Sequence, residues 1–305
     1  METNLLIVDI SHDRVVVAEF DMVQRLPVCT DQYSLMEHRD VDAVLAVHFG
    51  RTRHSAAETC CVVCNALRSG EWVIPFHDPR MRFTENTLKA LSGIKNLFFL
   101  SPAEALAFST LMPAEQGILH LAGEAALSGS EINLTVELDN GVACSLLSSG
   151  ARGWEHHRIT GEPEALRDIP FLQDFIHHSG IKLLLSERGL TKLHDWVCIR
   201  NGRDAQGLLS TDILAEQGGE DEEARELTAE HYFTLLQGFI GYLRSVLNSK
   251  GHGPVVIIRT SSPSEFERRY RRHAAASSAA PVYLIRHDTP RLYGAAAWYT
   301  QFLAR

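Results

Sequence analysis

The chain has 305 residues, of which 45% are hydrophobic and 22% charged, and its formal net charge is −9. This composition excludes a disordered or collagen-like chain, and the acidic balance argues against a nucleic-acid partner, which would need a basic face. No apolar run approaches the roughly 20 residues of a membrane span, and the N-terminus lacks a positively charged leader. We therefore expect a cytoplasmic protein, and the length predicts two lobes.

The first half of the chain predicts a strand-rich lobe. Two β-branched runs at 5–10 and 15–20 are separated by four polar residues, which is typical of a hairpin. Pro102 suits the first turn of a helix, because its missing N–H costs little there. The other elements expected in this half are a strand at 29–36, a helix leading into a strand at 40–48, strands at 59–67 and 72–74, a helix at 84–91 closed by Ser92 and Gly93, and a strand at 96–100.

The second half alternates strands with helices, which implies parallel pairing. Its other expected elements are paired strands at 132–138 and 142–147 joined by Asp-Asn-Gly, helices over 162–199, a long amphipathic helix with apolar residues from Phe233 to Leu247, strands at 254–258 and 281–285, and a final helix at about 293–303. We place a small α/β lobe at 1–103 and a large α/β lobe at 104–305. The final helix is free to return to the small lobe.

Cysteine, histidine and arginine clusters raise three further questions. The six cysteines are too sparse for a disulfide framework, and for the Cys61-Val-Val-Cys64 pair we favour a buried strand over a zinc site. The fifteen histidines include adjacent pairs that do not converge on one ion, so no metal site is expected. An exposed helix with internal ion pairs is expected for Arg268 to Arg272, with a phosphate or acidic-partner site as the alternative.

The end of the chain carries the most recognisable segment. Residues 281–290 read Pro-Val-Tyr-Leu-Ile-Arg-His-Asp-Thr-Pro, and Leu292-Tyr-Gly294 follows. This resembles bacterial ATP-dependent glucokinases, in which an apolar strand is followed by His-Asp-Asn-Pro, Leu-x-Gly and a closing helix. Further short segments match the same family in order, at 69–73, 141–143, 185–190 (Leu-Ser-x-x-Gly-Leu against Leu-Ser-Gly-x-Gly-Leu) and 238–243.

The resemblance implies an α/β protein with the two-lobed actin-like ATPase (ribonuclease H-like) fold of the bacterial glucokinase type. Each lobe is then built on a mixed five-stranded sheet, and a cleft holds ATP, magnesium and sugar. Family members are commonly homodimers, so a homodimer is expected here.

The two phosphate loops of that family depart from its pattern in this chain. The first reads Asp-x-Gly-Gly-Thr-Asn in the family and Asp-Ile-Ser-His-Asp-Arg at 9–14 here, so that Asp9 remains near the implied magnesium position while both glycines are lost. The second reads Gly-Thr-Gly-Leu-Gly in the family and Glu-Leu-Asp-Asn-Gly at 137–141 here, and only Gly141 remains. Because glycine turns let backbone N–H groups approach phosphate, these changes weaken the implied ATP site.

Three other ligand positions are also altered. In the family an Asn-Asp pair supplies the catalytic base. This pair aligns with Ser101-Pro102 here, which leaves Glu104 as a weak candidate for the base. The Gly-Gly that contacts adenosine in the family aligns with Arg259-Thr260. The sugar-binding Gly-Glu-Gly-Gly-His falls near 150–157, where Trp154, Glu155 and His156 are candidates for sugar contacts. The alternative, which we favour there, is a polar surface loop. A further sugar-contacting Glu of the family aligns with Lys182.

These departures favour a catalytically inactive glucokinase-like pseudoenzyme with a regulatory, scaffold or sugar-sensing role. No cofactor is then expected, and the partners would be a protein or a hexose, with no nucleic acid and no membrane. The alternative is an active sugar kinase with a rearranged site, which would need ATP and Mg²⁺. A third class, a structural subunit, would use the helix with Arg268 to Arg272 as its contact surface.

Overall fold

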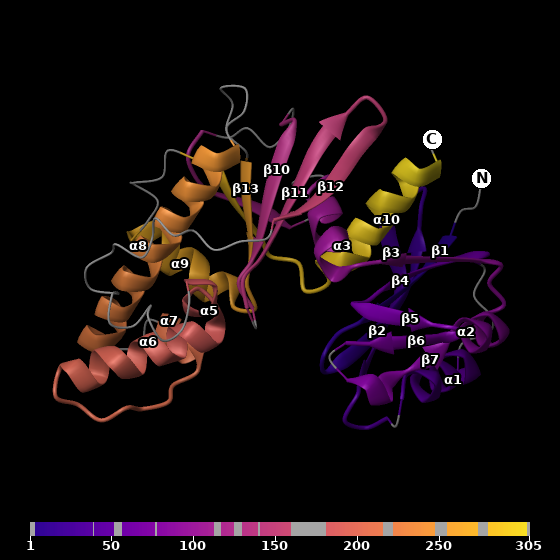
Figure 1. Cartoon of the computed structure of the whole chain (residues 1–305), viewed down its shortest axis with the longest axis horizontal. Helices are drawn as coiled ribbons and strands as arrows, with labels where there is room; N and C mark the ends of the chain where they lie inside the picture. Colours follow the sequence, from indigo (N-terminus) through magenta and orange to yellow (C-terminus); the bar gives the residue numbers. More distant parts are fainter. Residues whose placement is uncertain are drawn as a thin grey trace. The chain divides into compact units, whose positions relative to one another are not determined.

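The computed structural model forms two compact units: unit 1 comprises Met1–Met112 with Asp288–Arg305, and unit 2 comprises Pro113–His287 (Figure 1). The structure describes residues 4–38, 40–51, 57–76, 78–112, 117–124, 130–139, 141–159, 181–215, 222–247, 255–273 and 280–303. No described helix is both long enough and apolar enough to cross a bilayer.

Unit 1 is built on a five-stranded sheet in the order β3-β2-β1-β4-β8. Its strands are β1 (Asn4–Ile10), β2 (Arg14–Asp21), β3 (Leu26–Ser34), β4 (Thr59–Val63) and β8 (Asn96–Leu100). β1 pairs antiparallel with β2, which confirms the predicted hairpin, and parallel with β4, which in turn pairs parallel with β8. The mixed sheet expected for this lobe is therefore present.

Both faces of this sheet are buried, and strand periodicity assigns side chains to each face. Leu6 and Val8 pack with α1 (Val41–Arg51) and α2 (Glu85–Ser92), whereas Leu5 and Ile7 pack with α3 (Pro102–Ser109) and α10 (Pro290–Leu303). Strands covered on both sides read as continuous apolar runs, which explains the sequence at 5–8.

Two expectations for unit 1 need correction. The strand expected at 59–67 is two strands, because the chain leaves the main sheet after Val63 and enters a second one. That second sheet contains β5 (Ala66–Ser69), β6 (Trp72–Pro75) and β7 (Phe83–Thr84), and the short helix η1 (Pro79–Met81) precedes β7. The segment expected at 40–48 is helical from Val41 onward and contains no strand, since Val41, Val44 and Leu45 recur at helical spacing and are buried.

The unit boundary and the closing helix also differ from expectation. The expected division at 103 falls inside α3, and unit 1 continues to Met112. Unit 1 also contains α10, the return to the first lobe that we allowed for the final helix. α10 begins at Pro290 instead of 293. α10 belongs to unit 1 because it packs closely on α3, with no room for a side chain at Gly294.

Unit 2 is built on a six-stranded sheet in the order β12-β11-β10-β13-β14-β9. Its strands are β9 (Ile118–Ala122), β10 (Ile132–Glu137), β11 (Ala143–Gly150), β12 (Gly153–Ile159), β13 (Val255–Arg259) and β14 (Val282–Ile285). β10, β13 and β14 are parallel, as the alternation of strands and helices predicted. The implied five-stranded sheet is wrong for this unit, because β9 adds an antiparallel edge strand beside β14.

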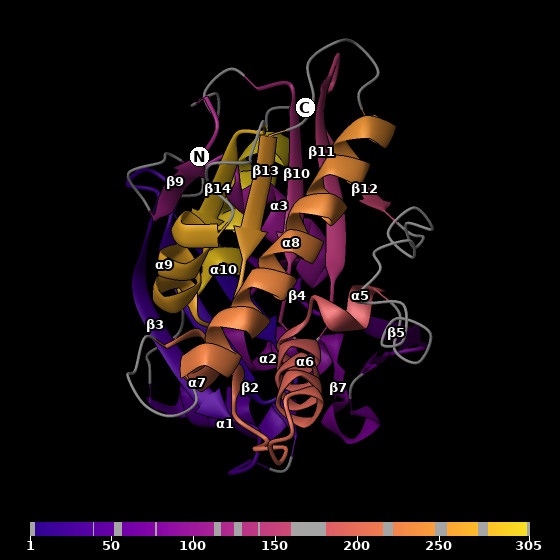
Figure 2. The same cartoon turned by 90° about the vertical axis from the view of Figure 1, so that its left-hand side faces the viewer.

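One face of this sheet is covered by α8 (Glu222–Leu247), which crosses in front of β10 and β13 (Figure 2). Phe233, Leu236 and Ile240 of α8 lie in one core with Val256 and Ile258 of β13, which confirms the predicted amphipathic helix. The other helices of unit 2 are α5 (Ile181–Leu184), α6 (Glu187–Arg200), α7 (Ser210–Leu214) and α9 (Pro263–His273). The part of the helices expected over 162–199 that precedes 181 lies outside the described residues.

The two cysteines of β4, and Cys64 directly after it, are buried, as expected for thiols that act as small hydrophobes. Cys60, Cys61 and Cys64 are at most 6% exposed, and burial raises the pKa of each thiol, to about 12 for Cys64. Among the described residues no group of three His, Cys, Asp or Glu side chains could hold a metal ion.

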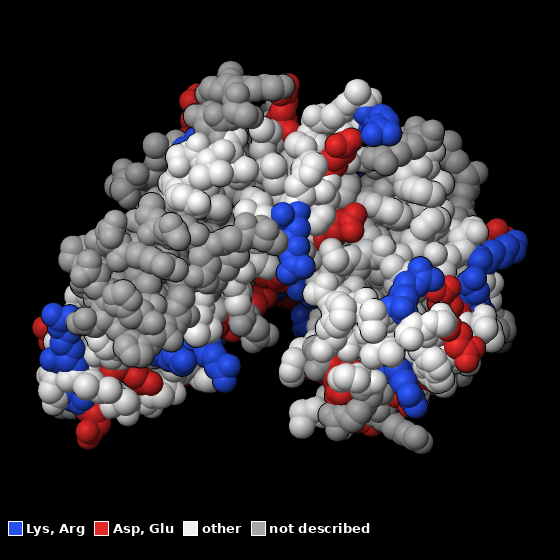
Figure 3. All heavy atoms as spheres, in the orientation of Figure 1, with Lys and Arg blue, Asp and Glu red and all other residues white. Residues whose placement is uncertain are grey.

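On the face drawn in Figure 3, acidic and basic side chains are interspersed on both units.

Asp42, in the first turn of α1, predicts a pH effect on stability. Burial and then repulsion by Asp40 raise the pKa of the Asp42 carboxyl to about 6. Since the unfolded chain releases this proton near pH 4, ionising Asp42 should lower the free energy of unfolding as pH rises from about 4 to 6. We expect Asp42→Asn to add about 1 kcal/mol at pH 7, a figure reduced for solvent screening, and to remove this part of the pH slope.

Urea unfolding of wild type and Asp42→Asn at pH 4, 5, 6 and 7 measures this effect. Asp204→Asn, at an exposed position of unit 2, is the control and should leave the slope unchanged. Equal pH slopes for wild type and Asp42→Asn would contradict the prediction.

Candidate functional site

The first candidate site lies where β1 ends in unit 1. A tight turn follows Asp9, closed by a hydrogen bond from the Ser11 backbone N–H to the Arg14 carbonyl (2.9 Å). Asp9 is 7% exposed. Arg291, in the first turn of α10, places its Nη1 3.8 Å from Asp9 Oδ1 and donates to Ser11 Oγ at 3.2 Å. The chain therefore supplies its own cation to the carboxylate that the resembled phosphate loop retains.

This arrangement does not fit a magnesium ion. Mg²⁺ takes oxygen ligands in octahedral geometry and is usually held by carboxylates together with substrate phosphates. Here a guanidinium, which cannot lose its proton, lies beside Asp9 and would repel a second cation. His12 and Asp13, at the tip of the same turn, are exposed and provide no glycine amide for phosphate. Sequence reasoning missed Arg291, which lies in the turn just after the recognised His-Asp-Thr-Pro segment.

Ser101 and Glu104 lie at the start of α3, after β8. Ser101 is the N-cap of the helix, and its Oγ accepts from the Glu104 backbone N–H at 3.1 Å. Burial raises the pKa of the Glu104 carboxyl, partly opposed by a backbone hydrogen bond from Ser101. A raised pKa suits a general base or acid, so Glu104 stays a candidate by its chemistry alone. The hydroxyl of Ser101 is used in capping and is no substitute for a base.

The second candidate site lies at the carboxyl ends of β10 and β13 in unit 2. The Leu138 backbone N–H donates to the Arg259 carbonyl (2.8 Å), and the Glu187 backbone N–H donates to the Asp139 carbonyl (3.0 Å). Three segments distant in sequence are thereby joined at one edge of the sheet.

The electrostatics of this edge are dominated by two carboxylates. Burial and repulsion by Asp139 raise the pKa of the Glu187 carboxyl, while the Ser261 N–H and the Arg259 charge lower it. Gly141, retained from the second phosphate loop, has open space around it and is exposed, so no packing explains it. The residues present do not fit a triphosphate, because carboxylates stand where amide donors are needed.

Glu187 is the residue that sequence reasoning missed. Its signal was present at 185–190, where the family reads Leu-Ser-Gly-x-Gly-Leu and this chain reads Leu-Ser-Glu-Arg-Gly-Leu. The second glycine of that motif, Gly189, is retained for packing, since a Cβ there would meet the Leu183 carbonyl oxygen at 2.0 Å. Gly189 is thus kept because backbone packs on backbone there, whereas the first glycine of the motif is replaced by Glu187.

The sugar-contact candidates lie on an edge strand, which corrects the surface loop that we favoured. Trp154, Glu155 and His156 belong to β12, which pairs with β11 in an antiparallel hairpin. Successive side chains of a strand alternate between faces, so Trp154 and His156 share one face and Glu155 lies on the other. Burial lowers the pKa of His156, helped by the charges of His157 and Arg158. The side chain of Lys182 lies outside the described residues.

The arginine-rich segment forms α9 and is not simply an exposed helix. Arg269 is fully buried, and it donates to the Leu214 carbonyl (3.1 Å), the Ala215 carbonyl (3.2 Å) and Glu226 of α8. Other arginines of the segment also bond to other elements: Arg272 to Glu226 (3.4 Å) and Arg271 to the His120 carbonyl (3.0 Å). Within α9, Arg268 pairs with Glu265 and Arg271 pairs with Glu267, as expected.

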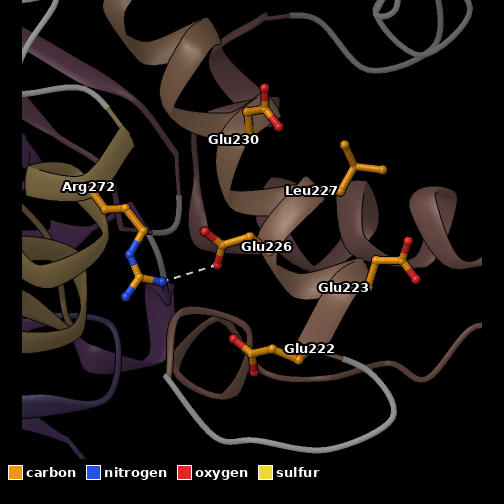
Figure 4. Close-up of a pocket in the computed structure, with 6 residues that line it drawn as sticks. All are labelled: Glu222, Glu223, Glu226, Leu227, Glu230 and Arg272. Carbon is orange, nitrogen blue, oxygen red and sulfur yellow. Dashed lines mark hydrogen bonds and ion pairs between the residues drawn. The ribbon is translucent and has the colours of Figure 1, made fainter.

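A shallow groove of about 520 Å³ adjoins this helix in unit 2. It is lined by Leu227, Arg272 and four glutamates of α8, and Arg272 points at Glu226 (Figure 4). These pairs hold α8 against α9, so the arginines of α9 are structural groups.

Comparison with known proteins agrees with this fold. No protein-family model matches the chain. It is 29% identical over 299 residues to the glucokinase of Chromobacterium violaceum, covering 92% of this chain and 83% of that protein. The crystal structure of a glucokinase from an Antarctic psychrotroph superposes with a TM-score of 0.76 at 15% identity, covering 98% of this chain and 99% of that one.

A ROK family transcriptional regulator, a homologue of the Escherichia coli MLC protein, has a TM-score of 0.63 at 11% identity, over 98% of this chain and 78% of that one. The fold is therefore the two-lobed actin-like ATPase fold of the ROK and glucokinase structures. The predicted resemblance is confirmed: the chain is similar to bacterial glucokinases along nearly its whole length.

Proposed function

We propose that this protein is a glucokinase-like protein that does not catalyse phosphoryl transfer and acts instead as a regulator, scaffold or sugar sensor. The observation that carries the proposal is the Asp9–Arg291 pair, in which an internal guanidinium lies beside the carboxylate that would face magnesium. Transfer of the γ-phosphoryl group depends on positioning and charge neutralisation by metal and backbone amides. A site that lacks those groups has no route to that chemistry.

The lost base supports the same proposal. Ser101 caps α3, and Glu104 lies one helical turn further on. A base must lie within hydrogen-bond reach of the sugar hydroxyl, and displacement of about 1 Å can cost roughly 100-fold in rate. The ROK family transcriptional regulator is an instance in which this fold serves a role other than sugar phosphorylation. Such a protein would bind another protein, a hexose or a second copy of itself.

An active sugar kinase with a rearranged site is the second candidate, and the raised pKa of Glu104 favours it. In that case Glu104 would accept the hydroxyl proton, and ATP and Mg²⁺ would be required.

A coupled assay with glucose, ATP and Mg²⁺ distinguishes the two candidates. We expect no turnover above background from the wild-type protein, and no change in Glu104→Gln. Turnover that is well above background and is lost in Glu104→Gln would disprove the proposal. Calorimetry with glucose alone then tests the sugar-sensing role, and Trp154→Ala and His156→Ala should each weaken any glucose binding while Glu131→Gln should not.

A further inference from the structure

The unit 2 sheet ends in the strand β9, and one arginine of α9 covers its outer edge. Within the described residues β9 pairs with β14 alone, so its other side is an edge of the sheet. In an antiparallel pair, alternate residues turn their N–H and C=O groups toward the partner strand. The Arg286 N–H donates to the Gly117 carbonyl at 2.8 Å, so the backbone groups of Leu119, two residues on, also face β14. The N–H and C=O groups of Ile118 and His120 therefore point away from β14.

The pairing of β9 with β14 is interrupted by a β-bulge. Val282 opposes Ala122 and Tyr283 opposes His120, which leaves Leu121 without an opposite residue. Bulges are frequent at sheet edges, where they break the regular pattern of groups that a further strand would need. The bulge also brings two consecutive carbonyls, those of His120 and Leu121, within reach of one side chain.

Arg271 is the side chain that takes both carbonyls. Its Nη2 donates to the His120 carbonyl at 3.0 Å, and its Nη1 donates to the Leu121 carbonyl at 3.4 Å. Its Nε donates to Glu267 Oε1 at 3.1 Å, one helical turn earlier, and this bond orients the guanidinium. α9 packs against β9 and β14 (Figure 2). An oriented cation therefore occupies acceptors that a strand added at this edge would use.

Stability does not explain this contact. The Arg271 side chain is 46% exposed, and at such a position water can take the place of the guanidinium on a carbonyl. Within α9 the stabilising role belongs to Arg269, which is fully buried and bonds to α8. An open edge strand is a template for pairing with another chain, and charged side chains at the edge are a known means of preventing it.

We propose that Arg271 is an edge cap, which keeps a strand of a second copy of this chain from adding to β9. An incoming strand would have to displace the guanidinium from two carbonyls and from Glu267. Without the cap, β9 of one copy would pair with β9 of another, because an antiparallel pair of identical edges is self-complementary.

The test uses the full chain as wild type, Arg271→Met and Arg271→Gln. Arg268→Met is the matched control, because Arg268 is an exposed arginine of the same helix and pairs with Glu265. Light scattering over a range of protein concentrations measures the mean mass, and amide hydrogen exchange of β9 locates an added strand. Circular dichroism establishes that each variant is folded.

We expect Arg271→Met and Arg271→Gln to associate at concentrations where the masses of wild type and Arg268→Met stay constant. In associated Arg271→Met the Ile118 and His120 amides should exchange about tenfold more slowly than in wild type, because the added strand accepts from them. The Leu119 amide faces β14 and should be unchanged. Ile118→Pro in the Arg271→Met background removes an outward N–H without a bond to β14, so it should restore the wild-type mass.

Three results would overturn the proposal. One is folded Arg271→Met and Arg271→Gln proteins whose masses match wild type at every concentration. Another is association without slower exchange of the Ile118 and His120 amides, which would place the contact elsewhere. The third is a folded Arg271→Met, Ile118→Pro protein that still associates. If Arg271→Met does not fold, Arg271→Gln decides the outcome, and if neither folds while Arg268→Met does, Arg271 is a stabilising residue and the proposal fails.

Discussion

Gly294→Ala is expected to lower the free energy of unfolding of unit 1 by about 3 kcal/mol or more. A Cβ at this position would lie 1.6 Å from the Ala105 carbonyl oxygen and 2.9 Å from the Ser109 backbone nitrogen, both in α3. Backbone cannot yield as a flexible side chain can, so α10 and α3 would have to separate. That separation would open the core in which Ala105, Leu292 and Tyr293 are buried.

Thermal unfolding followed by circular dichroism measures this effect, with an expected fall in Tm of roughly 10 °C. Gly141→Ala is the matched control, because a Cβ there meets nothing within 4 Å and the backbone is not in the left-handed region. It should change the stability by no more than about 0.5 kcal/mol. Equal losses in the two variants would show that glycine flexibility and not helix packing determines the result.

Arg269→Met is expected to destabilise unit 2 by about 3 kcal/mol. The substitution removes the donor for the Leu214 and Ala215 carbonyls and one cation from Glu226. Glu226 is 37% exposed and keeps Arg272 as a partner, so the unpaired carbonyls supply most of the cost. Comparing this loss of stability with that of a surface arginine of the same helix decides between a structural and a partner-binding role for α9.

Arg268→Met on the same helix is the control. Arg268 is 52% exposed and its pair with Glu265 lies at the surface, so its loss should cost less than about 0.5 kcal/mol. Urea unfolding of both variants gives the two free energies. If Arg268→Met proves the more damaging, the buried arginine is not the group that stabilises the contact between α8 and α9.

Much of the fold could be predicted because its signals are local. The β-branched runs at 5–10 and 15–20 form β1 and β2, and Gly93 ends α2 as expected. The edge strand β9 was not predicted, because its five residues with a central histidine show little periodicity. Its partner strand β14 also lies far away in the sequence. β12 was missed for a similar reason, since its pattern is polar on both faces.

The sequence by itself determined which ligand residues are absent, because the glycines of the two phosphate loops are replaced by Ser11 and His12 in the first loop and by Glu137 and Asp139 in the second. Only the tertiary structure decided what took their place. Arg291 reaches Asp9 from a position 282 residues further along the chain, and the charge of Arg259 acts on the Glu187 carboxylate from 72 residues further along. Charge pairing acts through space, so a residue's partner depends on which strand and helix ends the fold brings together, and sequence distance carries no information about it.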